Sequence, residues 1–323
     1  MTLFRFGYVA MSVHLQNASP SKTMTFSQFS KIADREAAVR KLERIAKTNL
    51  HNCLRLLRHN VAHEIDFFRL SSKLIPLANH PELLDWNYIK PLSEELSQIE
   101  TFIDKHPNLR IDFHPDHFVL LNSKDKKNFS VSLKTLQMHY ELLSMMGINA
   151  AHRCVLHVGG GYDDKEKALE QFIHNWGLVP ARLQQMIILE NDDSSFNLKE
   201  TLYLSEKLGI PLVFDYHHHL ANHEKGASFE EDWSRVVDSW SHSLLPVKMH
   251  ISSPRSEKDF RAHADFVDLE MFWTFAEAVK GTVEQIDVMI EAKLKDESLF
   301  RLIKDIREQK QVEWVTATSF RMV

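Results

Sequence analysis

The sequence predicts an α/β protein folded as a single (β/α)8 TIM barrel with a metal site at the C-terminal ends of its strands. Eight short β-rich runs recur along the 323 residues, and longer segments with helical apolar spacing lie between them. Strand–helix alternation repeated eight times favours a closed parallel barrel over a doubly wound open sheet. Most of these runs also finish on a potential metal ligand, and the strand ends of such a barrel meet at one mouth.

The predicted strands are Leu3–Tyr8, Asp66–Ser71, Arg110–His114, Cys154–His157, Ile187–Glu190, Leu212–Asp215, Pro246–His250 and Gln285–Glu291. The predicted helical segments include Glu36–Thr48, Tyr88–Lys105, Leu133–Met146, Leu198–Leu208 and Asp268–Val279. Gly147 and Gly209 follow two of these segments and precede the next strand, as helix-terminating glycines do. No repeat or linker divides the chain, so we expect one barrel domain over residues 1–308 and a C-terminal extension over residues 309–323.

The composition is that of an ordinary globular protein, with 44% hydrophobic residues. Cys53 and Cys154 are far apart and form no metal or disulfide motif, which suits core positions in a reducing cytosol. No apolar run approaches the roughly 18 residues that a membrane helix needs, and no signal-peptide pattern opens the chain. The net charge of −5 argues against coating of nucleic acid by bulk charge. We therefore expect a soluble, cytoplasmic protein with no membrane partner.

Potential metal ligands close six consecutive predicted strands, namely His114, His157, Glu190, Asp215, His250 and Glu291. Strand alternation places Lys248 on the same face as His250. His218 lies three residues after Asp215 and can fold back to the mouth, and the loop residues His80 and His263 are further candidates.

Imidazole and carboxylate ligands together suit Zn²⁺ or Mn²⁺. Some nine ligands imply two or three ions, the arrangement used for in-line displacement at phosphorus. A single strand-end histidine is more often structural, but burying so many ionisable groups without metal would cost too much desolvation. For His217, His219 and His223, solvated loop positions are the simpler expectation.

Loops at the predicted mouth carry two further features. Gly159-Gly160-Gly161 is either a phosphate cradle or a flexible turn, because a lone glycine run does not distinguish them. Cationic residues follow the third and seventh predicted strands, and they are either solvated surface or contacts to a phosphate backbone. These residues are Lys124, Lys126, Lys127, Arg255, Lys258 and Arg261.

An ordered set of motifs resembles the UV damage endonucleases over nearly the whole chain up to Glu291. The set comprises Arg5-Phe6-Gly7-Tyr8, Phe68-Arg69-Leu70-Ser71-Ser72, Leu77-Ala78-Asn79-His80, His114-Pro115-Asp116-His117-Phe118, Leu156-His157-Val158-Gly159-Gly160, Leu189-Glu190-Asn191-Asp192, Asp215-Tyr216-His217-His218 and Lys248-Met249-His250. The resemblance implies a DNA repair endonuclease that nicks damaged double-stranded DNA 5′ to cyclobutane pyrimidine dimers and 6–4 photoproducts by attack of metal-activated water. It also implies three divalent ions, most often Mn²⁺, with Zn²⁺, Mg²⁺ or Co²⁺ as alternatives.

By the same resemblance, the ligands fall on His80, His114, His157, Glu190, Asp215, His218, His250, His263 and Glu291. Glu190, Asp215, Lys248 and Glu291 are then the catalytic group, and Lys248 matches a lysine that can be carboxylated. Tyr8, Ser12, His117, Phe118 and Arg255 are expected to bind the DNA or the lesion. Here His117-Phe118 stands where the family pattern has Gln-Tyr, and Ser12 where it has Asn, which alters the hydrogen-bonding part of lesion recognition. We expect a monomer with no protein partner.

Three other functions compete with this hypothesis. An apurinic endonuclease of the same barrel superfamily would share a trinuclear site but act on a different lesion. A sugar isomerase of the xylose-isomerase type carries similar ligands around two metals, without needing cationic loops at the mouth. A non-catalytic module that stores metal or binds damage would bind DNA without cutting it.

Overall fold

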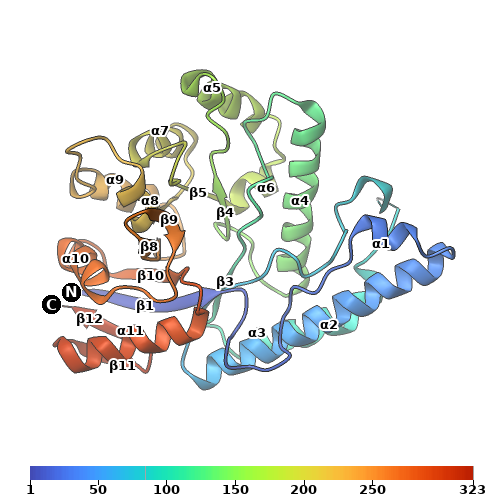
Figure 1. Ribbon diagram of the computed structural model, residues 1–323, viewed down its shortest axis with the longest axis horizontal. Helices are drawn as coiled ribbons and strands as arrows, with labels where there is room; N and C mark the ends of the chain where they lie inside the picture. Colours follow the sequence, from blue (N-terminus) through green and yellow to red (C-terminus); the bar gives the residue numbers. More distant parts are fainter. Residues whose placement is uncertain (84, 323) are drawn as a thin grey trace.

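Eight parallel strands form a nearly closed barrel in the computed structural model, which describes residues 1–83 and 85–322 (Figure 1). The order around the barrel follows the chain, and the circle closes where β10 pairs with both β7 and β1. Between β3 and β4 the pairing is a single bridge from Phe113 to Cys154. The barrel strands are β1 (Thr2–Val9), β2 (Phe67–Arg69), β3 (Arg110–Asp112), β4 (Cys154–His157), β5 (Ile187–Glu190), β6 (Leu212–Asp215), β7 (Val247–Ile251) and β10 (Gln285–Ile290).

All eight predicted strands are confirmed, and so is the barrel class. Between and after the strands lie the helices α1 (Phe26–Ser30), α2 (Arg35–Ala62), α3 (Ser93–Asp104), α4 (Lys126–Met145), α5 (Lys165–Trp176), α6 (Ala181–Met186), α7 (Leu198–Leu208), α8 (Tyr216–Ala221), α9 (Glu230–Ser239), α10 (Leu269–Val279) and α11 (Lys295–Gln309). Short 3-10 helices cover η1 (Pro81–Leu83) and η2 (Lys90–Leu92), and β8 (Pro254–Ser256) pairs with β9 (Asp259–His263) as a hairpin. None of these described helices is long and apolar enough to cross a membrane.

Helix α2 runs well beyond the predicted Glu36–Thr48 segment and lies along one side of the barrel with α3 (Figure 1). Its second half keeps a buried apolar stripe, but buried asparagines interrupt the apolar pattern in the sequence. Asn49 donates to the carbonyl of Leu74 at 3.0 Å, and Asn60 accepts the Tyr8 hydroxyl at 2.6 Å. Tertiary hydrogen bonds therefore make these polar positions compatible with a buried helix face.

The predicted helix ends at Gly147 and Gly209 are confirmed. Their φ angles are +72° and +66°, the left-handed conformation in which glycine lacks the steric penalty of a Cβ atom. Gly7 matters for a different reason, because a Cβ there would lie 2.1 Å from the carbonyl oxygen of Phe67. The close approach of β1 to β2 thus depends on a residue without a side chain.

The chain after residue 309 forms the hairpin β11 (Glu313–Thr316) and β12 (Ser319–Met322). β12 pairs antiparallel with the first half of β1, from Thr2 opposite Met322 to Arg5 opposite Ser319. Phe320 is fully buried and packs against Phe4 and Phe6, with ring centroids 5.6 and 5.8 Å away. The hairpin therefore covers the barrel wall at the N-terminal end of β1, whereas the mouth lies at the C-terminal ends of the strands. Val323 lies outside the described residues.

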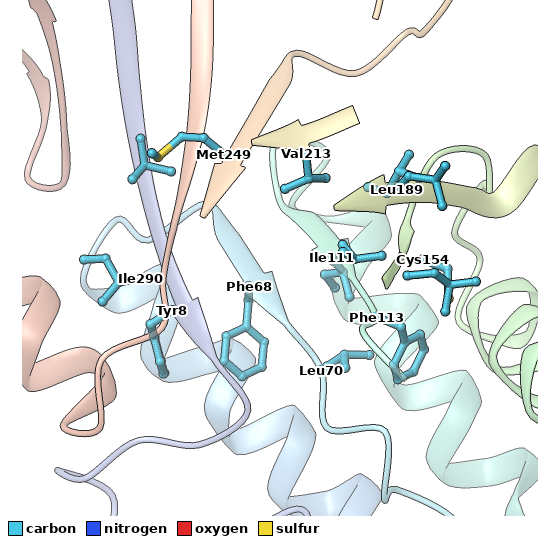
Figure 2. Packing of buried hydrophobic residues seen from close by; sticks show 14 of the residues in the cluster. Tyr8, Phe68, Leu70, Ile111, Phe113, Cys154, Leu189, Val213, Met249 and Ile290 are labelled. Carbon is cyan, nitrogen blue, oxygen red and sulfur yellow. The ribbon is translucent and has the colours of Figure 1, made fainter. Parts of the chain in front are cut away.

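Buried hydrophobic side chains from almost every barrel strand form one continuous core, part of which Figure 2 shows around Phe68 and Phe113. Cys154 belongs to this core, and both cysteines are free and fully buried. Burial raises the pKa of the Cys53 thiol to about 12. The predicted core role of the two cysteines is confirmed.

Candidate metal centre

Glu190, the last residue of β5, is the centre of the barrel mouth. Its side chain is fully buried, and its two oxygens face histidines from three other strands. Oε2 lies 3.0 Å from His114 Nε2 and 3.7 Å from His157 Nε2, while Oε1 lies 2.9 Å from His250 Nδ1. Burial opposes ionisation of this carboxyl, but the charges of His250 and His157 outweigh it, so the pKa of Glu190 lies well below its usual range.

Two groups of possible ligands share Glu190. His114, His157 and Glu190 form the first group, and Glu190, Asp215 and His250 form the second; within each group the ligand atoms lie within 4.8 Å of one another. Because one carboxylate belongs to both groups, it is placed to bridge two ions.

Two more side chains adjoin the second group. His218 Nδ1 is 3.7 Å from Asp215 Oδ2, and Glu291 Oε1 is 3.1 Å from His250 Nδ1. Burial, followed by the neighbouring charges of Glu190 and Glu291, raises the pKa of Asp215 to about 6 although His218 opposes it. Three carboxylates thus crowd one buried site, as metal ligands do.

The histidine hydrogen bonds fit metal ligation. His114, His218 and His263 direct Nδ1 at the backbone carbonyls of Pro115, Asn191 and Glu291, at 3.0, 3.0 and 2.8 Å. An Nδ1–H held by a carbonyl leaves the Nε2 lone pair as the ligand atom, the arrangement usual in metal sites. Burial lowers the pKa of His114 to about 4, so its ring is neutral. With Nδ1 directed at the Pro115 carbonyl, Nε2 faces Glu190 at 3.0 Å as a potential ligand atom.

Unpartnered buried atoms give a second test of this fit. Among the described residues, His157 Nδ1, Asp215 Oδ2 and His250 Nε2 are buried without a hydrogen-bond partner. Buried polar atoms are almost always paired, and an ion is one of the partners that satisfies them. The donor set at the mouth is therefore suited to divalent cations.

His80 makes a different set of contacts. Its ring stacks on Phe26, with centroids 4.0 Å apart, and its Nδ1 accepts the backbone N–H of Glu82 at 3.2 Å. Arg69 lies at the end of β2 and forms an ion pair with Glu291 at the mouth. The predicted second strand continued to Ser71, so the strand-end rule did not select Arg69, and a cation is not a metal-ligand type.

Beneath the mouth lies a buried layer of charged side chains that the sequence analysis did not predict. Lys248 and His250 face the same side, as alternation predicts, and Lys248 Nζ lies 3.1 Å from Asp112 Oδ2. Asp112 also pairs with Arg110 at 3.1 Å and Arg153 at 3.5 Å. Burial, then the charge of Arg110, lowers the pKa of Lys248 although Asp112 opposes the shift.

Asp287 is the second carboxylate of this layer. It pairs with Arg110 at 2.9 Å and with Arg5 at 2.7 Å. Strand register explains the grouping, because Arg5 lies opposite Asp287 and Asp287 lies opposite Lys248 on neighbouring strands. Arg110 and Asp112 share β3, but Arg5, Lys248 and Asp287 come from three other strands, so no single motif in the sequence reveals the whole network.

The predicted DNA-contacting residues fall into two sets. Tyr8 is fully buried and donates to Asn60, and the hydroxyl of Ser12 is bound to Asp296, so both form hydrogen bonds inside the protein. His117 and Phe118 lie in the loop after β3, where Phe118 is 74% exposed. Arg255 is an exposed residue of the β8–β9 hairpin and pairs with Asp259.

The prediction of solvated positions was wrong for two histidines beside His218. His217 is 1% exposed, with its ring nitrogens 2.6 Å from Ser252 Oγ and from the carbonyl of Phe260. His219 is 5% exposed and packs against Phe214. The reason is that residues 216–221 form helix α8 rather than a loop, so its first turns are buried. His223, beyond the helix, is exposed as predicted.

A cavity of about 390 Å³ adjoins the metal ligands, and we call it the mouth cavity. Its volume is within the range of about 300–1,000 Å³ that is usual for ligand sites. It shares His114, His157 and His218 with the ligand groups and extends over the loops after β3, β4 and β5. The remaining lining residues are Pro115, Asp116, His117, Val119, Leu120, Leu156, Gly159, Gly160, Tyr162, Asp192, Asp193, Ser194 and Ser195.

Comparisons with known proteins agree over almost the whole chain. Residues 4–321 match the family model described as UV-endonuclease UvdE. A UV DNA damage endonuclease from Halalkalibacterium halodurans is 53% identical over 316 residues, which is 98% of this chain and 98% of that protein. The crystal structure of SacUVDE superposes with a TM-score of 0.81 at 32% identity, covering 94% of this chain and 98% of that one. Endonuclease IV from Thermus thermophilus has a TM-score of 0.55 at 14% identity over 94% and 99% of the two chains, which shows a shared fold alone.

Proposed function

The chain belongs to the UV-endonuclease UvdE family, and we propose that it nicks UV-damaged double-stranded DNA on the 5′ side of the lesion. The lesions concerned are cyclobutane pyrimidine dimers and 6–4 photoproducts. The observation that carries the proposal is Glu190, which joins two ligand groups at the mouth directly beside a cavity. A bridged cluster of cations is the usual device for displacement at phosphorus.

Three divalent ions, with Mn²⁺ as the best suited, would be held by the nine predicted ligands, including His80. When bound, such ions lower the pKa of a water molecule and neutralise charge on the leaving oxygen. Glu190 would supply a carboxylate to both ligand groups, and its low pKa keeps it ionised at neutral pH. Asp215 and Glu291 supply two further negative charges against the incoming cations, and hydrogen bonds to backbone carbonyls orient His114, His218 and His263.

Lys248 acts from the layer below the ligands. Its ammonium group is bound by Asp112 and lies over the ring of Phe67, with Nζ 5.3 Å from the ring centroid. These two contacts fix the side chain. This position supports His250 from beneath on the same strand. Carboxylation of Lys248 would need its neutral amine, a state that burial favours.

DNA contacts are assigned to the loops around the mouth. Lys124, Lys126 and Lys127 at the start of α4 and Arg255, Lys258 and Arg261 on the β8–β9 hairpin are all exposed. Such residues bind phosphates and position the duplex without reading its sequence. His117 and Phe118, whose rings lie 4.1 Å apart, project at the cavity edge where they can enter a distorted duplex.

The test is a comparison of supercoiled or synthetic duplexes before and after UV irradiation, incubated with the purified protein and Mn²⁺. We expect nicks only in the irradiated duplex, 5′ to the lesion, with a 3′-hydroxyl. Equal cutting of both duplexes, or of neither, would refute the proposal. Repeating the assay with different divalent ions, each at several ratios of ion to protein, identifies the metal.

An apurinic endonuclease activity is the alternative; the Thermus thermophilus endonuclease IV shares the fold, and that likeness favours neither activity. A duplex with one synthetic abasic site, run beside a dimer-containing duplex, separates the two activities. Faster cutting of the abasic duplex would favour the alternative. We further propose that the protein is cytoplasmic and monomeric. Light scattering on the purified protein tests the monomeric state directly.

A further inference from the structure

Tyr162 lies in the wall of the mouth cavity with 54% of its surface exposed. Its φ angle is +48°, a left-handed backbone conformation that bulky side chains rarely adopt. Residues held in such sparsely populated conformations gather at ligand sites. An exposed aromatic in a strained backbone beside a catalytic cluster therefore needs a functional explanation.

The glycines before Tyr162 build the surface on which its ring lies. Gly159 has φ +117°, and a Cβ there would lie 2.3 Å from Asn122 Oδ1. The Asn122 amide donates to the carbonyl of Gly160 at 2.8 Å, which clamps this loop to the loop after β3. A Cβ on Gly160 would lie 3.4 Å from Cζ of the Tyr162 ring, so the ring rests against the glycine backbone. The glycine run thus serves as a platform for an aromatic side chain.

The rest of the cavity is suited to an uncharged planar group. Val119, Leu120 and Leu156 supply apolar lining, and none of the described lining residues is lysine or arginine. Asp116 and Asp192 add negative charge, which would repel a phosphate. The cations that His114, His157 and His218 would help to hold would attract the reacting phosphate instead, so the cavity itself is left for a base attached to that backbone.

We propose that Tyr162 is a specificity-determining residue that stacks on a nucleobase turned out of the duplex into the mouth cavity. The inference rests on the proposed function, because it takes DNA with a weakened base pair as the substrate. A damaged or unpaired base costs least to rotate out of the stack, so a stacking partner in the cavity favours damaged over intact DNA. Stacking requires the ring and not its hydroxyl group.

The experiment measures kcat/KM for a UV-irradiated and an undamaged duplex with Mn²⁺. It compares the wild-type protein with Tyr162→Phe, Tyr162→Ala and the control Tyr203→Ala, a tyrosine 45% exposed on α7 and outside the cavity lining. Bound Mn²⁺ per chain is measured for each. We expect Tyr162→Ala to lose about 10-fold or more on the irradiated duplex, chiefly through KM, with unchanged metal content. Tyr162→Phe and Tyr203→Ala should match the wild type.

Three outcomes would overturn the inference. Activity of Tyr162→Ala equal to Tyr203→Ala would show that the ring contributes nothing. Equal losses in Tyr162→Phe and Tyr162→Ala would assign the effect to the hydroxyl group, and loss of bound Mn²⁺ would assign it to the metal centre. A wild-type protein that cuts both duplexes alike would instead refute the proposed function, and this inference with it.

Discussion

Replacing Asp112 by asparagine tests the buried charged layer beneath the mouth. The carboxylate is fully buried, and its partners Lys248, Arg110 and Arg153 lie 3.1, 3.1 and 3.5 Å away. Asparagine keeps the shape but removes the charge, which deprives Lys248 of its ion-pair partner and leaves Arg110 with its second pair, to Asp287. Removing one partner of a buried ion pair costs about 3–5 kcal/mol, and we expect the free energy of unfolding to fall by that amount.

The assay is urea unfolding of the metal-free protein, because bound ions would stabilise the folded state and mask the change. The midpoint should fall while the m-value stays constant. In thermal unfolding, an entropy of about 2.1 cal/mol/K per residue over 323 residues means a loss of about 1.5 °C per kcal/mol, so the midpoint should drop by about 4–7 °C. Asp85→Asn, which removes an exposed pair with Arg35, is the matched control and should leave the midpoint unchanged.

A decrease of less than about 1 kcal/mol in Asp112→Asn would refute this reasoning, since that is the effect expected of a surface ion pair. Such a result would mean that Lys248 loses its proton, or that the cations reach water, in the variant. Cleavage of UV-irradiated DNA is a second measurement on the same variant. It should decline, because Lys248 loses its anchor below His250.

Three further predictions concern the mouth, the recognition loop and acid stability. Glu190→Ala should abolish cleavage and reduce bound Mn²⁺, while the circular dichroism spectrum stays that of the wild-type fold. Full activity would contradict the ligand assignment. His117→Ala should weaken discrimination between irradiated and intact duplexes in a binding assay, and unchanged discrimination would show that His117 does not enter the distorted duplex. Burial lowers the pKa of His139 to about 4, against about 6.5 unfolded. As the pH falls, this histidine takes up a proton in the unfolded chain at a higher pH than in the folded protein, so the free energy of unfolding of the metal-free protein should fall between about pH 6.5 and about pH 4. His139→Leu should flatten that decline. An unchanged pH profile would exclude His139 as its source.

Local sequence patterns were sufficient for the strands and for the ligands at their ends. Each barrel strand is a short apolar run, and the residue that follows is placed at the mouth by the fold class alone. Glu190, Asp215 and His250 were found in this way, and the structure brings their ligand atoms within 4.8 Å of one another. Helix α2 was underestimated because Asn49 and Asn60 look polar in the sequence but find hydrogen-bond partners in distant segments.

The sequence by itself therefore determined the barrel, the side of it that carries chemistry and the residue types available there, because strand periodicity and strand ends are local properties. The tertiary structure decided which of those residues act together. It stacked His80 on Phe26, hydrogen-bonded Tyr8 and Ser12 inside the protein, and brought Lys248 of another strand against Asp112. It also placed Tyr162 in the cavity wall. These relations depend on strand register and loop packing between residues far apart in the chain, which no local pattern encodes.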